Sequence, residues 1–499
     1  MGMQRVKAVP GFAGRLSSIY KAAILGVAMT VPVTGASISQ SYSQEDGTEV
    51  SRMMRRIEGR VNALNLRFPV VIMDDDSINL RPTRNDPTFR NRFQEVLLDR
   101  NIHLRWNIKS EILEALGGLK GPEGRNPAAI RVSPDHYANS ANPLDAGIAQ
   151  SFMCIVIPPV ADVSSKKLME DWLAKSGPTV MKVTHDPGPY ALMLRATWHE
   201  VWHCLDKEFY REQYIVPGDK AIDNAMRMHM SEVFADVAST LTMAGMGYSE
   251  MARDMADIRT LSSYWNGPRS TFGSRPSDEN YYEGAVYYIG RAQDLMHKHI
   301  QEAGIARVSA YSMEDIARIA GEVTRAAALD RDELKLLTDF YARGSSYSGL
   351  LKAEAEAGNQ ESRRRLAFLA GIQERVRIAK ERLLIDQGQP VDHVRGEKSA
   401  SHWDARDTLK HLATDEKGAI EVAVRERVNA ARLRGQAPEQ GVVGLIDDWR
   451  RDVHAAGAIN KERERQLYVL SLMLSYGELD RALGRDAHPA GLRFAGPSQ

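Results

Sequence analysis

Two histidines and a glutamate lie close together in the segment LRATWHEVWHCLDKEF, residues 194–209. Because residues four apart lie on the same face of a helix, His199 and His203 can direct both imidazoles at one metal ion. This HExxH spacing is typical of zinc, and Glu200 can reach a water molecule in the open coordination position of the metal. The metal lowers the pKa of that water toward about 7, and the carboxylate takes its proton as the water attacks a carbonyl. The segment therefore predicts metal-assisted hydrolysis of an amide bond.

A catalytic zinc needs a third protein ligand, and the downstream segment HMSEVFADVAS, residues 229–239, can supply it. Glu232 and Asp236 are four residues apart, so they share one face of a predicted helix. Glu232 can be the third ligand, and Asp236 can accept the second ring N–H of a ligand histidine, which fixes the tautomer of that histidine. The second segment thus contains the third ligand and the orienting carboxylate that the first segment lacks.

Together, HEVWH and EVFAD resemble the gluzincin metallopeptidases, whose thermolysin-like site reads HExxH on one helix and ExxxD, often ExxAD, on a second. The resemblance implies one Zn²⁺ per chain, bound by His199, His203 and Glu232. It also implies Glu200 as the general base, Asp236 as a carboxylate that orients a ligand histidine, and a protein or peptide substrate. The resemblance covers only the part of the chain that contains the two motifs.

Gluzincins usually add a tyrosine, histidine or arginine that stabilises the developing oxyanion, and no motif fixes this residue here. The candidates are Tyr214, Arg275, Tyr282 and Tyr287. The family also presents an edge strand to extended substrate, upstream of the zinc helix. Residues 151–160 and residues 179–185 are the two candidates for that strand.

Other polar residues near the motifs have alternative interpretations. Asp206 lies on the helical face of the two histidines, but each further turn moves about 5.4 Å along the axis, so a role at the helix end or in orienting a ligand is favoured. His229 is close to the face of Glu232 and is a minor alternative ligand. The metzincin pattern requires a ligand six residues after His203, and Phe209 at that position excludes it.

Residues 1–36 have the features of a secretory signal peptide. Four basic residues and no acid precede the apolar run of residues 22–36, and Thr34 and Ala36 fit the small-x-small pattern of a signal peptidase site. The run is shorter than the roughly 20 residues of a membrane span, and Pro32 interrupts it. We therefore expect a secreted or periplasmic protein without stable membrane insertion of the mature chain. An uncleaved anchor and an unstructured N-terminus are the alternatives.

The composition excludes several classes of function. Lysine and arginine together number 65, as do aspartate and glutamate, so the formal net charge is zero at pH 7. This balance provides no basic surface for nucleic acid, and no nucleic-acid partner is expected. Cys154 and Cys204 are the only cysteines, which excludes a disulfide framework and a cysteine-based zinc finger. A single bridge between these two cysteines is left open, as is the oligomeric state.

The length of 499 residues predicts two or more domains. Residues 50–305, with strand-like runs before the motifs and helical patterns around them, predict a zincin-like metallopeptidase domain of the α+β class. Residues 310–485 contain amphipathic helical patterns that predict a helical C-terminal domain, so the whole chain is expected to be predominantly helical. Residues 386–407 are expected to form an exposed loop or hinge between helices.

The sequence predicts a zinc metallopeptidase that uses zinc-activated water and Glu200 as general base. A competing hypothesis is an interaction protein in which zinc only braces the fold and the helical C-terminal half binds a partner. Glu200 argues against it, because a purely structural site has no use for a base. A third hypothesis is the same protease acting as a secreted effector or toxin. Substrate specificity, and the choice between endopeptidase and exopeptidase, are left open.

Overall fold

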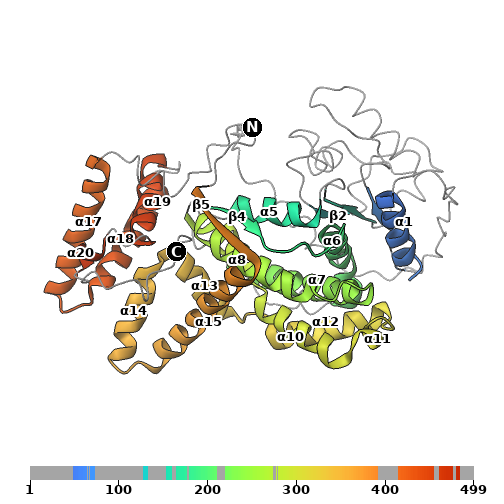
Figure 1. Ribbon diagram of the computed structural model, residues 1–499. Helices are drawn as coiled ribbons and strands as arrows, with labels where there is room; N and C mark the ends of the chain where they lie inside the picture. Colours follow the sequence, from blue (N-terminus) through green and yellow to red (C-terminus); the bar gives the residue numbers. More distant parts are fainter. Residues whose placement is uncertain are drawn as a thin grey trace, which may run out of the picture. The chain divides into compact units, whose positions relative to one another are not determined.

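Helices make up most of the described chain in the computed structural model, and the strands are few and short (Figure 1). This confirms the predominantly helical α+β class. The structure describes residues 49–64, 66, 68–73, 127–132, 153–159, 164–176, 179–210, 220–272, 277, 279–390, 414–454, 460–475 and 479–483. The signal peptide predicted for residues 1–36 lies outside these ranges. Among the described helices, none is both long enough and apolar enough to cross a membrane.

The chain divides into two compact units, residues 1–161 and residues 162–499. The described elements of the first unit are one helix and three strands: α1 (Glu49–Asn62), β1 (Val70–Ile72), β2 (Ala128–Val132) and β3 (Met153–Ile157). Strand β3 pairs in parallel with β1 and antiparallel with β2, so it is the central strand of this sheet. The expectation that residues 151–160 supply an edge strand for substrate is therefore wrong, because both sides of β3 are already paired.

The second unit contains the rest of the described elements. These are α5 (Ser165–Ser176), β4 (Thr179–Val183), α6 (Ala191–Phe209), α7 (Ala221–Gly245), α8 (Met251–Phe272), η5 (Glu279–Tyr282), α9 (Glu283–Val286), α10 (Gly290–Ala303), α11 (Ile305–Val308), α12 (Met313–Ala327), α13 (Arg331–Arg343), α14 (Ser345–Glu356), α15 (Gln360–Leu383), β5 (Leu384–Pro390), α17 (Thr414–Leu433), α18 (Pro438–His454), α19 (Lys461–Ser475) and α20 (Asp480–Leu483). Both sequence motifs lie in this unit, on α6 and α7.

Helices α6 and α7 are both deeply buried and pack against each other through large side chains. The ring of Trp202 on α6 meets Phe234 on α7 edge to face, with 6.0 Å between the ring centroids. The indole N–H of Trp202 also donates to Thr242 Oγ1 at 3.1 Å, which satisfies the buried polar end of the side chain. These contacts hold the two helices that carry the motifs in a fixed register.

Two hydrophobic cores of the second unit lie among helices that follow α6 in the chain. One core joins residues of α7, η5, α9, α13, α14 and α15, and therefore contains side chains from both sides of the predicted boundary at residues 305–310. The other core consists of residues from α17, α18, α19 and α20 alone. The position of the boundary between a peptidase domain and a helical C-terminal domain stays a prediction.

The segment that leads from β4 into α6 is held by the end of α15. Strand β4 pairs antiparallel with β5, which directly follows α15, and the backbone N–H of Thr184 donates to Leu383 O at 2.9 Å. The Arg382 guanidinium donates to Asp254 Oδ1 on α8 at 2.9 Å, and His185 Nε2 lies 3.1 Å from the same oxygen. Because Asp254 is almost fully buried, this network fixes α15, α8 and the approach to α6 together.

Replacing Arg382 by alanine is expected to lower the free energy of unfolding by about 2 kcal/mol, because the buried Asp254 carboxylate loses its arginine partner. The matched control is Arg377→Ala, on the same helix, whose ion pairs to Glu374 and Glu381 are exposed and contribute little. Urea unfolding followed by circular dichroism measures both. Equal midpoints for the two variants would contradict the role given to Arg382.

Candidate metal centre

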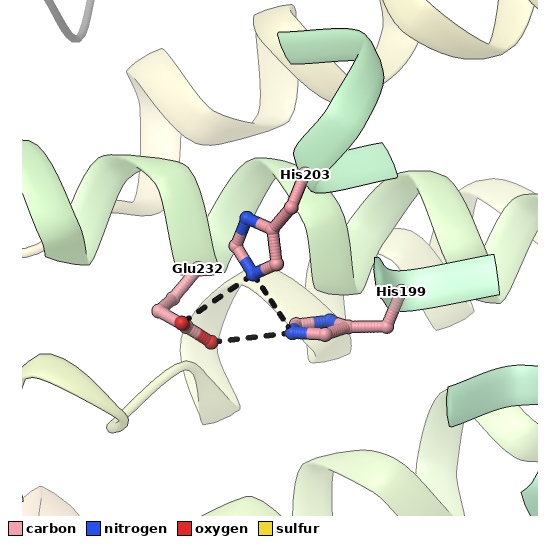
Figure 2. A group of neighbouring side chains, drawn as sticks. All are labelled: His199, His203 and Glu232. Atoms are coloured by element: carbon pink, nitrogen blue, oxygen red, sulfur yellow. Dashed lines mark hydrogen bonds and ion pairs between the residues drawn. The ribbon is translucent and has the colours of Figure 1, made fainter. Parts of the chain in front are cut away.

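Helices α6 and α7 bring three potential ligands together in the interior. His199 Nε2 and His203 Nε2 lie 3.0 Å apart, and each lies 3.4 Å from a carboxylate oxygen of Glu232. Figure 2 shows the two rings and the carboxylate pointing toward one another, the histidines from one helix and the glutamate from its neighbour. The three residues are only 4, 4 and 7% exposed. Among the described residues, this is the one group of three or more such side chains that could hold a metal ion.

The arrangement of polar atoms fits a cation at the centre of this group. The two facing Nε2 atoms can satisfy each other only if one is a donor and the other an acceptor. Within the described part of the chain, the Oε2 atom of Glu232 is buried and forms no hydrogen bond, although His199 Nε2 lies 3.4 Å away. Two imidazole nitrogens and one carboxylate oxygen that converge in a buried site form a donor set typical of a bound transition metal.

Asp236 lies behind His199, one helical turn beyond Glu232 on α7. Its Oδ1 atom is 3.0 Å from His199 Nδ1, within hydrogen-bond distance of the ring nitrogen that faces away from Glu232. A carboxylate at this position holds the proton on Nδ1 and leaves Nε2 free to bind a metal. Asp236 is fully buried, as its predicted role requires.

Two arginines that the motifs do not include balance the charge of Asp236. Arg195, one turn before His199 on α6, is fully buried and forms an ion pair with Asp236 Oδ1. Arg259 on α8 places its Nε atom 3.2 Å from Asp236 Oδ2 and its Nη2 atom 3.8 Å from Glu232 Oε2. Arg195 is four residues before His199, so helical spacing could have revealed it from the sequence. No local pattern reveals Arg259.

The potential ligands perturb one another's protonation. Burial, and then the nearby His203, lower the pKa of His199 well below its ordinary value. Burial opposes the charged form of His203, but the Glu232 carboxylate outweighs this and raises its pKa. Burial likewise acts against the charged form of Glu232, yet the two histidines lower its pKa well below the ordinary range. These shifts favour a neutral His199 and an ionised Glu232, the states that bind a metal, whereas the raised pKa of His203 means that a metal must displace a proton from this ring.

Glu200 follows His199 on α6 and is also buried. Burial raises the pKa of Glu200 to about 7, against the opposing influence of His203. A carboxyl group with a pKa near neutrality can take up and release a proton at physiological pH, which is the requirement for a general base.

The four candidates for the residue that stabilises the oxyanion differ in what the structure describes of them. Tyr214 and Arg275 lie outside the described residues. Tyr282 is buried in the core formed by α7, η5, α9, α13, α14 and α15. The ring of Tyr287 lies 5.7 Å from the guanidinium carbon of Arg259, which itself contacts Asp236 and lies near Glu232. Of the described candidates, Tyr287 is the one that the contacts connect to the potential ligands.

His229 is a structural residue of the core and does not join the potential ligands. Its Nδ1–H donates to Val286 O at 2.8 Å, and its Nε2 accepts the backbone N–H of Leu329 at 2.8 Å. Both ring nitrogens are therefore occupied, and the alternative of His229 as a metal ligand is wrong. The neutral ring connects α7 to the end of α9 and to the chain just before α13.

The stability of the protein is expected to depend on pH through His229. Burial lowers its pKa from 6.5 to about 4, with Arg291 adding to the shift against the Val286 carbonyl. Between pH 6.5 and 4 the unfolded state binds more protons, so the stabilisation present above pH 6.5 is lost as the pH falls, by about 3 kcal/mol in total. Urea unfolding of wild type and His229→Asn at a series of pH values, both with a metal chelator present, measures this loss of stability. A variant with the same pH slope as wild type would contradict this assignment.

Strand β4 remains a candidate for the edge strand, because the described part of its sheet has only β5 as a second strand. Cys154 and Cys204 are both buried, and neither is a free thiol.

Protein-family models, curated protein sequences and solved structures were compared with the chain, and none of them matches it. The geometry of the site and the two motifs are therefore the features that indicate the function.

Proposed function

We propose that the protein is a zinc-dependent peptidase with a gluzincin-like site that hydrolyses peptide bonds in protein or peptide substrates. The observation that carries the proposal is the convergence of His199, His203 and Glu232 in a buried group on two packed helices. Two histidines and one glutamate are a ligand set of catalytic zinc in metallopeptidases, and three protein ligands leave the fourth tetrahedral position open for water. Structural zinc sites almost always use four protein ligands instead.

The residues of the chain have separate tasks in this proposal. When bound, Zn²⁺ would supply Lewis-acid activation of a water molecule and of the scissile carbonyl. His199, His203 and Glu232 hold the ion, and Asp236 keeps the His199 ring in the tautomer that binds it. Glu200 takes the proton from the attacking water and passes it to the nitrogen of the leaving amine.

The competing hypothesis of a zinc-braced interaction protein accounts for the ligands but not for Glu200. A bracing site needs no base, and burying the carboxyl group of Glu200 costs free energy that a bracing role does not explain. The catalytic proposal gives this residue a task. We therefore favour a peptidase over a binding protein.

The location and organisation of the protein are also part of the proposal. We place a zincin-like peptidase domain at residues 50–305 and a helical C-terminal domain at residues 310–485. With residues 1–36 as signal peptide, the enzyme would act in the periplasm or outside the cell. A secreted effector or toxin would use the same chemistry on a substrate in another cell.

Elemental analysis and a cleavage assay on the same purified protein test the proposal. We expect about one zinc per chain after dialysis, and cleavage of an unbiased peptide library that a zinc chelator abolishes and added Zn²⁺ restores. Zinc without cleavage would favour the bracing hypothesis over the peptidase. A protein that binds no zinc would overturn both.

A further inference from the structure

The two histidines of the metal centre are supported in different ways. The Nδ1 atom of His199 lies 3.0 Å from Asp236 Oδ1. The Nδ1 atom of His203 instead forms a hydrogen bond with the hydroxyl of Ser231, at 3.0 Å between Nδ1 and Oγ. The carboxylate that corresponds to Asp236 is thus replaced, on this side of the site, by a hydroxyl.

Ser231 does not end the chain of hydrogen bonds. Its Oγ donates to Asp206 Oδ2 at 3.1 Å, and both residues are buried, with 5% of Ser231 and 0% of Asp206 exposed. Ser231 precedes the ligand Glu232 on α7, and Asp206 lies one turn after His203 on α6. The hydrogen bonds therefore cross from one metal-binding helix to the other and back.

The direction of each hydrogen bond follows from the chemistry of the groups. An ionised carboxylate can only accept, so the hydroxyl hydrogen of Ser231 is directed at Asp206. The Ser231 oxygen is then free only as an acceptor toward His203, which must carry its proton on Nδ1. When the ring is neutral, that tautomer leaves the Nε2 lone pair pointing at His199 and Glu232, the position where a metal ion would sit.

We propose that Ser231 and Asp206 are positioning residues, which together hold His203 in the tautomer and orientation that bind the metal. The proposal rests on the metal centre described under Proposed function and adds two residues to it. Ser231 transmits the influence of Asp206, so both residues act through His203. Asp206, which the sequence placed on the face of the histidines, thereby receives a role other than that of a ligand.

The test measures metal affinity directly, with Zn²⁺ in competition with a chelating dye and with Co²⁺ absorption spectra. Ser231→Ala is expected to weaken Zn²⁺ binding about 10- to 100-fold and to change the Co²⁺ spectrum, because the His203 ring loses its anchor. Ser231→Thr keeps the hydroxyl and is expected to bind like wild type. The matched control is Ser239→Ala, a buried serine on the same helix that bonds only the Asp236 backbone carbonyl in the described contacts.

Asp206→Asn tests the direction of the hydrogen bonds. The asparagine amide can donate to Ser231, which lets the hydroxyl turn toward His203 and admits the wrong tautomer, so affinity is expected to fall about 10-fold. The double variant Ser231→Ala, Asp206→Asn is expected to bind no more weakly than Ser231→Ala alone, because the two residues act as one chain.

The outcomes separate this proposal from the one on which it rests. Wild-type affinity in both Ser231→Ala and Asp206→Asn would overturn the positioning role and leave the metal centre intact. Additive losses in the double variant would show that the two residues act separately, and would also overturn it. A wild-type protein that binds neither Zn²⁺ nor Co²⁺ would remove the metal centre itself.

Discussion

Replacing Glu200 by glutamine is expected to reduce peptide cleavage by about 1,000-fold or more while the zinc content stays at the wild-type level. Glutamine keeps the size of the side chain and removes only its ability to take a proton. The ligands His199, His203 and Glu232 are untouched, so the metal should still bind. The result expected is a loss in kcat, since the base acts in the transition state and not in substrate binding.

Glu322→Gln is the matched control, because Glu322 is an exposed glutamate on α12 paired only with a neighbouring arginine on the same helix in the described contacts. It should cleave like wild type. Zinc content from elemental analysis and initial rates of peptide cleavage, measured on the same preparations of both variants, test whether Glu200 is the base. Full activity in Glu200→Gln would remove the base from the mechanism and return the site to a bracing role.

Much of the metal centre was predictable because each half of it depends only on helical periodicity. His199 and His203 must share a face of any helix that contains them, and so must Glu232 and Asp236. Two short local patterns were therefore enough to predict three side chains that the structure brings together. The helical content was predictable for the same reason, since apolar residues at three- and four-residue spacing indicate helices wherever they occur.

The support around the ligands could not be predicted, because it depends on how the helices pack. Arg259 reaches Asp236 from α8, and nothing near residue 259 in the sequence indicates that partner. Ser231 lies beside Glu232 in the sequence, but its importance appears only when α6 places Asp206 within reach of its hydroxyl. Serines on helices are common, and only tertiary packing distinguishes this one.

The strands were the least predictable elements. The run of residues 151–160 was recognisable as a strand, but its central place in the sheet depends on β1 and β2, whose pairing is not encoded locally. Residues 386–407 were expected to be an exposed loop or hinge, yet residues 386–390 belong to β5, and residues 391–407 lie outside the described residues. The local pattern there is polar, with one glycine and one proline in residues 386–390, and pairing with β4 overrides it.

Replacing His199 by alanine is expected to lower zinc affinity by about 100- to 1,000-fold, the share of one ligand in the free energy of binding a zinc ion. The fold should survive, because Asp236 keeps its ion pairs with Arg195 and Arg259 after the imidazole is removed. In wild type, zinc at about 100 times its Kd should stabilise the native state by about 2.7 kcal/mol and raise the Tm by about 3 °C.

That rise in Tm should be absent in His199→Ala at the same zinc concentration, while the metal-free variant should melt close to metal-free wild type. The matched control is His299→Ala on α10, whose ring bonds the Tyr311 hydroxyl far from α6 in the chain and should leave the zinc response unchanged. Scanning calorimetry with and without zinc separates loss of binding from loss of folding. An undiminished zinc response in His199→Ala would show that the metal binds elsewhere, and the buried group of two histidines and a glutamate would then be an ordinary polar cluster between two helices.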